Sequence, residues 1–429
     1  MPSIADVIKP FISSFLGTDP RVSIRFWDGS HLGPDDGSTA IVVRSPVAIR
    51  RLLYSPGELG LARAYVAGDI DIEGDVFEGL AIRDALGSTR DQVSLSFSAR
   101  DRWAMLKAAR SLGVIGRPPP PPPEEARLRG GLHSRGRDAR AIAHHYDVGN
   151  DFYRIVLGPS MTYSCAYWEQ PGFALEDAQE AKYELICRKL GLHEGMRLLD
   201  VGCGWGGMVL HAARRHGVQA VGITISEAQA DAAAKRVAEA GLTHRVEIRL
   251  QDYRDVSDGP FDAISSIGMF EHVGLRGLSA YFTNLSSLLA PRGRLLNHAI
   301  SKPSGKAGFN KNSFIPRYVF PDGELQEVGR VVTAMQELGL EVRDVESLRE
   351  HYARTLRAWV ANLEAEWDRA VELAGPARAR IWRLYMAGSA LGFEAGRINI
   401  HQVLAVKPDP GGASGMPPTR APLIDPVES

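Results

Sequence analysis

From about residue 140 to residue 407, hydrophobic positions follow two patterns, one typical of strands and one typical of helices. Short apolar runs rich in β-branched residues, such as 196–202 (MRLLDVG), 218–226 (VQAVGITIS) and 261–268 (FDAISSIG), are typical of buried strands. Between the first two runs, 206–217 (GGMVLHAARRHG) repeats its apolar positions at helical spacing and closes on a glycine. This alternation predicts a doubly wound α/β domain with a parallel sheet, whose ligands bind at the carboxyl ends of the strands.

Further elements of the same kind complete this domain, which we place at residues 141–407. The segment after it, 408–429, is rich in Pro and Gly and has the composition of a disordered tail. The remaining predicted elements are a helix at 227–241 and strands at 245–252, 293–301 and 398–408.

Residues 1–115 follow a different pattern and are expected to form a smaller α+β domain that associates with lipid or membrane. Apolar residues between 4 and 16 (IADVIKPFISSFL) repeat at helical spacing, and Pro10 is expected to kink the helix. This stripe either packs on its own domain or lies in a membrane interface. Two short strands are predicted at 21–29 and 38–45.

Six consecutive prolines, 118–123, separate the two parts because such a run cannot continue a helix. Around them the charge becomes basic, with ten Lys and Arg against four Asp and Glu in residues 100–140. We expect residues 116–140 to be a Pro-rich basic linker, which is either simply solvated or attracted to anionic lipid headgroups.

The composition limits the class of protein. A chain of 429 residues is long enough for two or three domains, and a net charge of −1 gives no general attraction to nucleic acid. No apolar run reaches the roughly 18 residues needed to span a bilayer, and the start of the chain lacks the pattern of a signal peptide. The three cysteines are odd in number and indicate a reducing compartment. We therefore expect a soluble, cytoplasmic protein.

The stretch LLDVGCGWGG (198–207) carries the first candidate chemistry. Gly202, Gly204 and Gly207 match G-x-G-x-x-G, a pattern shared by many ligands that need close approach to the backbone. A dinucleotide site would also need an acidic residue at the end of the second strand, which here ends GITIS. Asp200 lies two residues before the first glycine, where it can orient the loop and face a cationic ligand.

The motif DVGCGWG resembles motif I of the class I methyltransferases that use S-adenosylmethionine, and QDYRD is similar to their adenine-side acidic motif. Four longer stretches narrow the resemblance to the cyclopropane fatty acid synthase family, which includes the mycolic acid cyclopropane synthases. In the first domain, LARAYVAGDIDIEGDV is similar to the phospholipid-acting branch of that family. The four stretches are 143–168 (AHHYDVGNDFYRIVLGPSMTYSCAYW), 222–229 (GITISEAQ), 266–274 (SIGMFEHVG) and 295–301 (LLNHAIS).

The resemblance implies a Rossmann-like methyltransferase that adds a methylene from S-adenosylmethionine to the cis double bond of unsaturated phospholipids. The product is expected to be a cyclopropane fatty acid, or a 10-methylene branched one. A lipid-binding protein on an inactive methyltransferase scaffold is the alternative of a different class. The implied partners are membrane phospholipids at the inner face of the membrane, with no nucleic acid and a possible homodimer.

The resemblance also implies site residues. A bicarbonate ion would act as the base, bound by the side chains of Glu271 and His298, the latter as imidazolium, by the main chain of Cys165 and Ile300, and by the Tyr352 hydroxyl. Each of three residues also has a structural interpretation. Cys165 can be a buried apolar residue, Glu271 a carboxylate at the start of a helix, and His298 a core histidine. The implied cofactor contacts are Tyr163 and Ser164 at the methionine end, Asp200, Gly202, Gly204, Thr224 and Gln229 around the loop, and Asp252 and Tyr253 near the adenine.

Two further groups of residues are candidates for carbocation shielding and for metal binding, and they are considered from their chemistry without the resemblance. Aromatic rings could shield a carbocation by their π faces or could simply be core residues; they are Trp205, Phe314, Tyr318 and Phe320. No metal is expected, because the histidines that suggest one lack the i, i+4 ligand spacing; they are His144, His145, His272 and His298.

Overall fold

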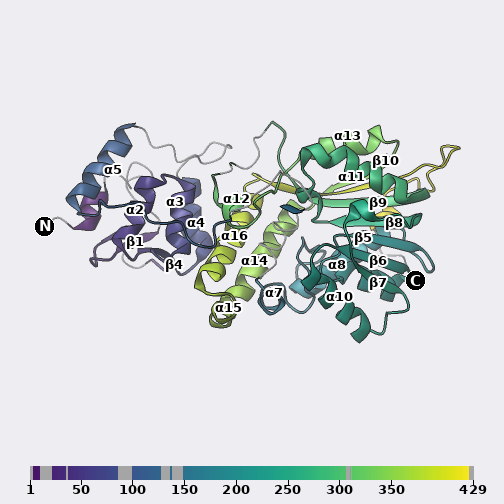
Figure 1. Ribbon diagram of the computed structural model, residues 1–429, viewed down its shortest axis with the longest axis horizontal. Coiled ribbons are helices and arrows are strands. Elements are labelled where there is room, and N and C mark those ends of the chain that lie inside the picture. Colours follow the sequence, from purple (N-terminus) through teal and green to yellow (C-terminus); the bar gives the residue numbers. More distant parts are fainter. Residues whose placement is uncertain are drawn as a thin grey trace. The chain divides into compact units, whose positions relative to one another are not determined.

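The computed structural model, drawn in Figure 1, describes residues 3–9, 22–34, 37–85, 99–126, 136–137, 148–305, 310 and 312–424. The chain forms two compact units. The second consists of Leu128–Gly308, Asp322–Asn362 and Gly392–Ser429, and the first of Met1–Arg127, Phe309–Pro321 and Leu363–Leu391. The expectation of one continuous catalytic domain at 141–407 is therefore wrong, because two segments from that range complete the N-terminal unit.

The first unit is built on a four-stranded sheet in the order β2-β1-β3-β4. β1 pairs in parallel with β3, and the other two pairs are antiparallel. The strands predicted at 21–29 and 38–45 are confirmed as β1 and β3. Residues 4–9 are helical as expected, while 10–21 lie outside the described residues. The elements are β1 (Ser23–Phe26), β2 (His31–Leu32), β3 (Ala40–Val43), α2 (Pro46–Tyr54), α3 (Glu58–Val66), β4 (Ile70–Glu73), α4 (Val76–Ala85) and α5 (Ala99–Ser111).

Two largely buried arginines attach a distant segment to this sheet. In α16 (Pro376–Glu394), Arg380 forms an ion pair of 2.8 Å with Asp71 of β4. Arg383 donates to the carbonyl of Ile72 at 3.0 Å and to Glu364 at 2.6 Å. Such long-range pairs leave no signature in local sequence periodicity, which is why the sequence predicted an uninterrupted second domain.

The Pro-rich segment packs on the first unit as far as it is described. Glu125 is buried and receives two hydrogen bonds of 2.8 Å from Arg63, and Arg51 donates to the carbonyl of Pro120 at 2.7 Å. Residues 116–126 therefore do not form a solvated linker, because specific polar contacts hold them. Of the basic residues beyond them, Arg137 is bound to Asp322 at 2.6 Å, and 127–135 lie outside the described residues.

The second unit contains a seven-stranded sheet in the order β10-β11-β9-β8-β5-β6-β7. β9, β8, β5, β6 and β7 run parallel, as predicted. β11 is antiparallel to both of its neighbours, which corrects the expectation of a wholly parallel sheet. The strands are β5 (Arg197–Val201), β6 (Gln219–Thr224), β7 (Val246–Leu250), β8 (Phe261–Ile267), β9 (Leu289–Ser301), β10 (Glu341–Ser347) and β11 (Asn399–Val406).

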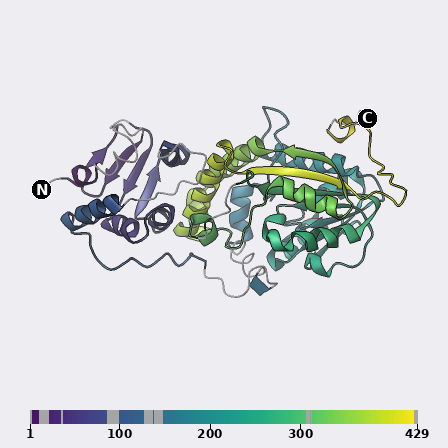
Figure 2. The same cartoon turned by 90° about the horizontal axis from the view of Figure 1, so that it is seen from above.

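Alternate residues of these strands face two separate hydrophobic cores, and Figure 2 shows the helices that surround the sheet. Leu199 of β5 belongs to the core beneath α11 and α13, whereas its neighbour Leu198 belongs to the core beneath α8 and α9. The helices and turns that matter below are α7 (Asn150–Leu157), α8 (Leu175–Leu190), α9 (Gly207–His216), α10 (Glu227–Glu239), η1 (Tyr253–Asp255), η2 (Phe270–His272), α11 (Gly274–Leu288), α12 (Phe314–Tyr318), α13 (Val328–Glu337) and α14 (Arg349–Ala365).

The segment after β11 was expected to be disordered, and up to residue 424 this expectation is wrong. The short helix α17 (Ala421–Ile424) buries Leu423 in the core beneath α8, and Arg188 of α8 donates to the carbonyl of Ile424 at 2.6 Å. Arg420 forms an ion pair with Asp344 of β10 at 2.7 Å. A few anchoring residues therefore hold a segment whose average composition is that of a tail.

Among the described helices, none has both the length and the apolar character needed to cross a membrane.

Candidate active site

The glycine loop between β5 and α9 forms the floor of the candidate site. Gly202 has φ +81°, and a Cβ atom there would lie 3.0 Å from Cβ of Met269. Gly204 has φ +53°, and nothing lies within 4 Å of where its Cβ would be. Glycine is required at both positions because side-chain-bearing residues rarely adopt these angles. The open space above Gly204 is where a ligand can approach the backbone.

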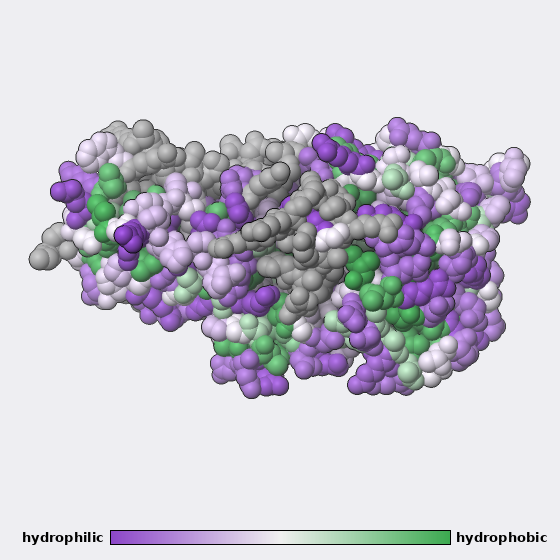
Figure 3. All heavy atoms as spheres, in the orientation of Figure 1, coloured by the Kyte–Doolittle hydropathy of each residue, from purple (hydrophilic) through white to green (hydrophobic). Residues whose placement is uncertain are grey.

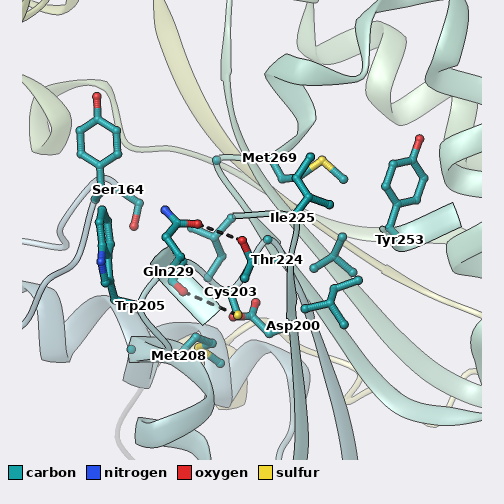
Figure 4. A pocket seen from close by; sticks show the side chains of 18 of the residues that line it. Ser164, Asp200, Cys203, Trp205, Met208, Thr224, Ile225, Gln229, Tyr253 and Met269 are labelled. Atoms are coloured by element: carbon teal, nitrogen blue, oxygen red, sulfur yellow. Dashed lines mark hydrogen bonds between the residues drawn. The ribbon is translucent and has the colours of Figure 1, made fainter. Parts of the chain in front are cut away.

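A cavity of about 210 Å³ lies at the carboxyl ends of β5, β6 and β8, the location expected for a doubly wound sheet. Figure 4 shows the side chains that converge on it. The structure brings together around this cavity all nine residues that the resemblance assigned to the cofactor; they are Tyr163, Ser164, Asp200, Gly202, Gly204, Thr224, Gln229, Asp252 and Tyr253.

Asp200, the last but one residue of β5, places a buried carboxylate in this wall. Its Oδ1 accepts a hydrogen bond of 2.6 Å from the Ser265 hydroxyl of β8. Burial raises the pKa of Asp200 to about 6, although the Ser265 hydrogen bond and the charge of Lys182 act in the opposite direction. The carboxylate is thus held in place and available to a cationic group.

On the opposite wall, the end of β6 leads into α10 through a polar turn. The Thr224 hydroxyl donates to Oε1 of Gln229 at 2.9 Å, a bond that Figure 4 also shows, and accepts from the backbone N–H of Ser226. Further along the wall, Asp252 caps η1 and accepts from the backbone and the guanidinium of Arg254 at 2.9 and 2.8 Å. A ligand group that binds Asp252 would therefore share its carboxylate with Arg254.

Lys182 of α8 is a wall residue that the sequence reasoning missed. It is completely buried, donates to the Ser164 hydroxyl at 2.9 Å and lies 3.7 Å above the Tyr183 ring centroid. Burial lowers the pKa of Lys182 to about 7. A signal was available, because Lys182 falls on the same helical face as Ala178 and Leu185, which are buried; a lysine on the apolar face of a helix is rare.

The four aromatic residues considered for carbocation shielding separate into two groups. Trp205 lines the cavity, and its Nε1–H donates to Oδ1 of Asn150 at 2.8 Å. The other three belong to the first unit, where Phe314 stacks on Tyr318 and the Tyr318 hydroxyl bonds to Glu125. Within the described residues, only Trp205 of this set borders the cavity.

Glu271 and Ile300, two of the five expected anion-site residues, contact each other directly. β8 ends at Ile267, opposite His298 of β9, so the backbone N–H of Ile300 lies beyond the last β8 pairing. The Glu271 carboxylate in η2 accepts this N–H through Oε1 at 2.7 Å. Ile300 was expected to offer its main chain to the anion, but in this structure its N–H is used by Glu271.

The Glu271 carboxylate is buried, and its second oxygen, Oε2, has no hydrogen-bond partner among the described residues. Burial raises the pKa of Glu271 to about 7, and the Ile300 hydrogen bond only partly offsets this effect. Glu271 is therefore a carboxyl group able to gain or lose a proton near neutral pH.

His298 is also completely buried in β9. Its Nδ1 lies 3.1 Å from Nε2 of Gln402, and within the described part of the chain its Nε2 has no partner. Burial, together with the nearby cations Lys182 and Lys189, lowers the pKa of His298 well below its usual value. These surroundings disfavour the imidazolium expected from the resemblance and favour a neutral ring.

Cys165 and Tyr352 meet at a shared backbone group. The Cys165 thiol lies 3.8 Å from the carbonyl of Leu348, and the same carbonyl accepts the N–H of Tyr352 at 3.0 Å. Burial raises the pKa of the Cys165 thiol far above its usual range, so the thiol is a neutral apolar group. The N–H of Leu348 in turn bonds to Ile400, which pairs with Ile300 in the sheet.

None of the five residues lines the cavity, but three of them adjoin residues that do. Ser164 and His272 line the cavity and are sequence neighbours of Cys165 and Glu271, while the lining residue Ile267 pairs with His298 across the strands. Neighbouring backbone thus connects the cavity with Cys165, Glu271 and His298.

A separate cluster of metal-ligand residue types lies between α8 and α9. The ligating atoms of Cys187, His211 and His216 lie within 4.8 Å of one another. Both histidines place Nε2 at 3.1 Å from the Glu184 carboxylate, whose pKa these bonds hold far below its usual range. The structure thus accounts for these histidines as partners of a carboxylate.

Comparison with known proteins defines the family. Residues 133–403, more than half of the chain, match the family model described as mycolic acid cyclopropane synthetase. A probable fatty acid methyltransferase of Mycobacterium tuberculosis is 45% identical over 97% of both chains. The cyclopropane-fatty-acyl-phospholipid synthase of Escherichia coli K12 is 40% identical over 61% of this chain and 66% of its own length.

Solved structures agree with this assignment. The mycolic acid cyclopropane synthase CmaA1, in complex with SAH and CTAB, is 35% identical, covers 63% of this chain and 98% of its own, and has a TM-score of 0.59. The cyclopropane synthase MmaA2 from Mycobacterium tuberculosis is 32% identical, covers 65% and 100%, and has a TM-score of 0.60. The chain belongs to the mycolic acid cyclopropane synthetase family and is one of its S-adenosylmethionine-dependent methyltransferases.

Proposed function

We propose that this enzyme transfers a methylene from S-adenosylmethionine to the cis double bond of unsaturated phospholipid acyl chains and forms cyclopropane fatty acids. Family membership gives the coarser reaction, methyl or methylene transfer to fatty acyl chains. The observation that carries the finer proposal is the pair of buried, unpartnered atoms, Glu271 Oε2 and His298 Nε2, on residues that adjoin the cavity-lining residues His272 and Ile267. A simple methyl transfer to a heteroatom would give such atoms no purpose.

The cavity wall suits the charged amino-acid end of the cofactor. Asp200 would face its ammonium group, with Tyr163 and Ser164 at the same end and Lys182 holding the Ser164 hydroxyl. The remaining proposed contacts are Gly202, Gly204, Thr224 and Gln229 around the loop, and Asp252 and Tyr253 at the adenine.

The alkene chemistry explains why the site must be dry. S-Adenosylmethionine supplies an electrophilic methyl group to a weakly nucleophilic double bond. The carbocation left on the acyl chain would react with any water present, so water exclusion is part of the mechanism. Tyr163 and Trp205 line the cavity with aromatic rings, whose faces can stabilise a cation without attacking it.

Ring closure then requires a base in apolar surroundings, and bound bicarbonate would supply it. The donor set fits an anion of this kind: His298 offers an unpaired nitrogen, and Glu271 can accept the hydroxyl proton of bicarbonate. Ile300 would act by holding the Glu271 carboxylate, rather than by touching the ion with its N–H. The Cys165 main chain and the Tyr352 hydroxyl are the remaining proposed contacts.

A methylene-branched product is the second candidate. Relatives that align with nearly the whole chain carry methyltransferase names: the 45% identical protein above, a probable fatty acid methyltransferase of Pseudomonas putida at 40% over 92% of this chain, and the tuberculostearic acid methyltransferase UfaA1 at 33% over 89%. The same cation would give this product if a hydride shift preceded loss of the proton. The two outcomes share the cofactor and the base.

We further propose that the first unit contacts the membrane through α5 and its surroundings. Trp103 and Leu106, one helical turn apart on α5, are 67% and 50% exposed, and the exposed Lys107 and Arg110 lie beside them in sequence. Figure 3 shows that apolar side chains lie among hydrophilic ones on one face of the molecule. Exposed aromatic and aliphatic groups with adjacent cations suit an anionic phospholipid surface.

The decisive experiment is product analysis. The purified protein is incubated with S-adenosylmethionine, bicarbonate and vesicles of cis-monounsaturated phospholipid, and the fatty acids are analysed by gas chromatography and mass spectrometry. A saturated ring with one added carbon is the expected product. An exocyclic methylene would favour the second candidate, and cofactor binding without any lipid product would indicate an inactive scaffold or another substrate.

A further inference from the structure

A layer of buried polar side chains separates α8 from the sheet at the carboxyl ends of the strands. His298 and Gln402 lie opposite each other in the β9–β11 pairing, two residues from Leu296 and Leu404. These leucines belong to the core beneath α8, so by strand alternation His298 and Gln402 also face α8. From α8, the completely buried Lys189 reaches this layer.

The hydrogen-bond chemistry of Lys189 fixes the orientation of Gln402. Lys189 forms ion pairs of 3.0 Å with Asp344 and 2.5 Å with Glu346, and it donates to Oε1 of Gln402 at 2.8 Å. An ammonium group can only donate, so the amide oxygen of Gln402 must face Lys189. The amide nitrogen then faces Nδ1 of His298, at 3.1 Å.

The orientation of Gln402 in turn fixes the position of the proton on His298. An amide NH₂ group has no lone pair to offer, so Nδ1 of His298 must be the acceptor of this bond. In a neutral imidazole the remaining proton is then on Nε2. This nitrogen is the buried atom that has no partner among the described residues.

We propose that Lys189 and Gln402 are positioning residues that hold His298 as its Nε2–H tautomer, so that the histidine offers a hydrogen-bond donor to the anion of the reaction. This inference rests on the proposed function for the identity of the anion, but the tautomer itself does not. With the opposite tautomer, the lone pair of Nε2 would point at the anion and repel it.

The surroundings of His298 explain why the tautomer matters more than the charge. The cations Lys182 and Lys189 lie on α8, and His401 lies on β11 beside Gln402; all three act with burial to keep the ring neutral. A neutral ring has a single N–H, so its position decides whether the site offers a donor or an acceptor. A positively charged ring would offer two donors. Lys189 and Gln402 would then not be needed to select the nitrogen that carries the proton.

The test is histidine ¹⁵N NMR on the full-length protein, with the His298 signals assigned by their loss in His298→Gln. We expect the wild type to show Nδ1 as an acceptor and Nε2 as N–H, with the Nε2–H signal shifting on addition of bicarbonate. In Gln402→Glu, the new carboxylate can only accept, so Nδ1 must gain a proton. Gln402→Met, an apolar change within a buried strand, should leave a mixture of tautomers.

The control is Arg420→Gln, which removes a half-exposed cation from Asp344 and Glu346 but replaces none of the three residues Lys189, Gln402 and His298. It should leave the His298 signals unchanged. Both Gln402 variants should weaken the bicarbonate response about tenfold or more, as is usual for residues that orient a ligating histidine. An Nδ1–H tautomer in the wild type, unchanged tautomers in both variants, or an unchanged bicarbonate response despite a shifted tautomer would each overturn the inference. The product assay tests the proposed function separately.

Discussion

A lysine buried beside a cofactor cavity needs a compensating charge, and Lys182 has the Asp200 carboxylate within electrostatic range. The two residues present opposite charges near the Ser164 hydroxyl, which Lys182 holds. An amino-acid ligand carries both a carboxylate and an ammonium group. Lys182 can therefore bind the carboxylate of such a ligand, and Asp200 can bind its ammonium group.

Lys182→Met keeps the length of the side chain and removes its charge. We expect it to weaken the binding of S-adenosylhomocysteine about tenfold, equivalent to roughly 1.4 kcal/mol. Binding of 5′-methylthioadenosine, which lacks the amino-acid portion, should be unchanged. Isothermal titration calorimetry measures both ligands, with the exposed Lys235→Met as the control. Equal weakening of both ligands would instead indicate a distorted cavity.

The raised pKa of Glu271 predicts that the free energy of unfolding depends on pH. Its pKa is raised from 4.5 to about 7 in the folded protein, so between these values the unfolded chain ionises while the folded carboxyl stays protonated. The wild type should therefore lose stability relative to Glu271→Gln as the pH rises from 4.5 to 7, by up to about 3 kcal/mol. Urea unfolding of both proteins at pH 5 and pH 8 measures this; a constant difference would contradict it.

The residues of the candidate site differ in how far the sequence revealed them. That nine of these residues lie together around one cavity could be predicted, because each belongs to a motif with its own residue type and spacing. Lys182 could be noticed only as a lysine on the apolar face of a helix, because its place beside the cavity depends on where α8 packs. The use of the Ile300 N–H by Glu271 could not be predicted, because it depends on the β8–β9 pairing ending at His298, two residues before Ile300.

At the scale of elements, the sequence predicted the central strands and missed β10. The central strands are buried on both faces and appear as apolar runs. β10, with the sequence EVRDVES, is an edge strand that carries charged side chains and fully buries only Asp344. That aspartate is held by Lys189 and Arg420, both far away in the sequence. Periodicity cannot reveal a strand whose buried position is ionic.

The exposed face of α5 gives a prediction at the same scale. Trp103→Ala combined with Leu106→Ala should reduce binding to anionic phospholipid vesicles several-fold, because the pair supplies apolar area that inserts between headgroups. Flotation or sedimentation of the protein with vesicles measures the effect. The matched control is Leu250→Ala, an exposed leucine of the second unit. Equal binding by all three proteins would exclude α5 as the contact.

At the scale of the whole molecule, the sequence identified a doubly wound domain and a smaller α+β domain in the correct order. It did not reveal that the segments Phe309–Pro321 and Leu363–Leu391 belong with the first unit. Domain boundaries were inferred from changes in composition along the chain, and these segments have the composition of their neighbours. Their assignment depends on long-range pairs such as Arg380 with Asp71.

This interleaving has a consequence for biosynthesis. A ribosome completes the N-terminal sheet early, but the α16 arginines that bond to β4 are added only after about nine-tenths of the chain has been made. The unit whose synthesis begins first therefore cannot acquire all of its contacts until most of the chain has been made. Until then the apolar surface that the C-terminal part of the chain covers stays exposed. We therefore expect the nascent protein to bind chaperones.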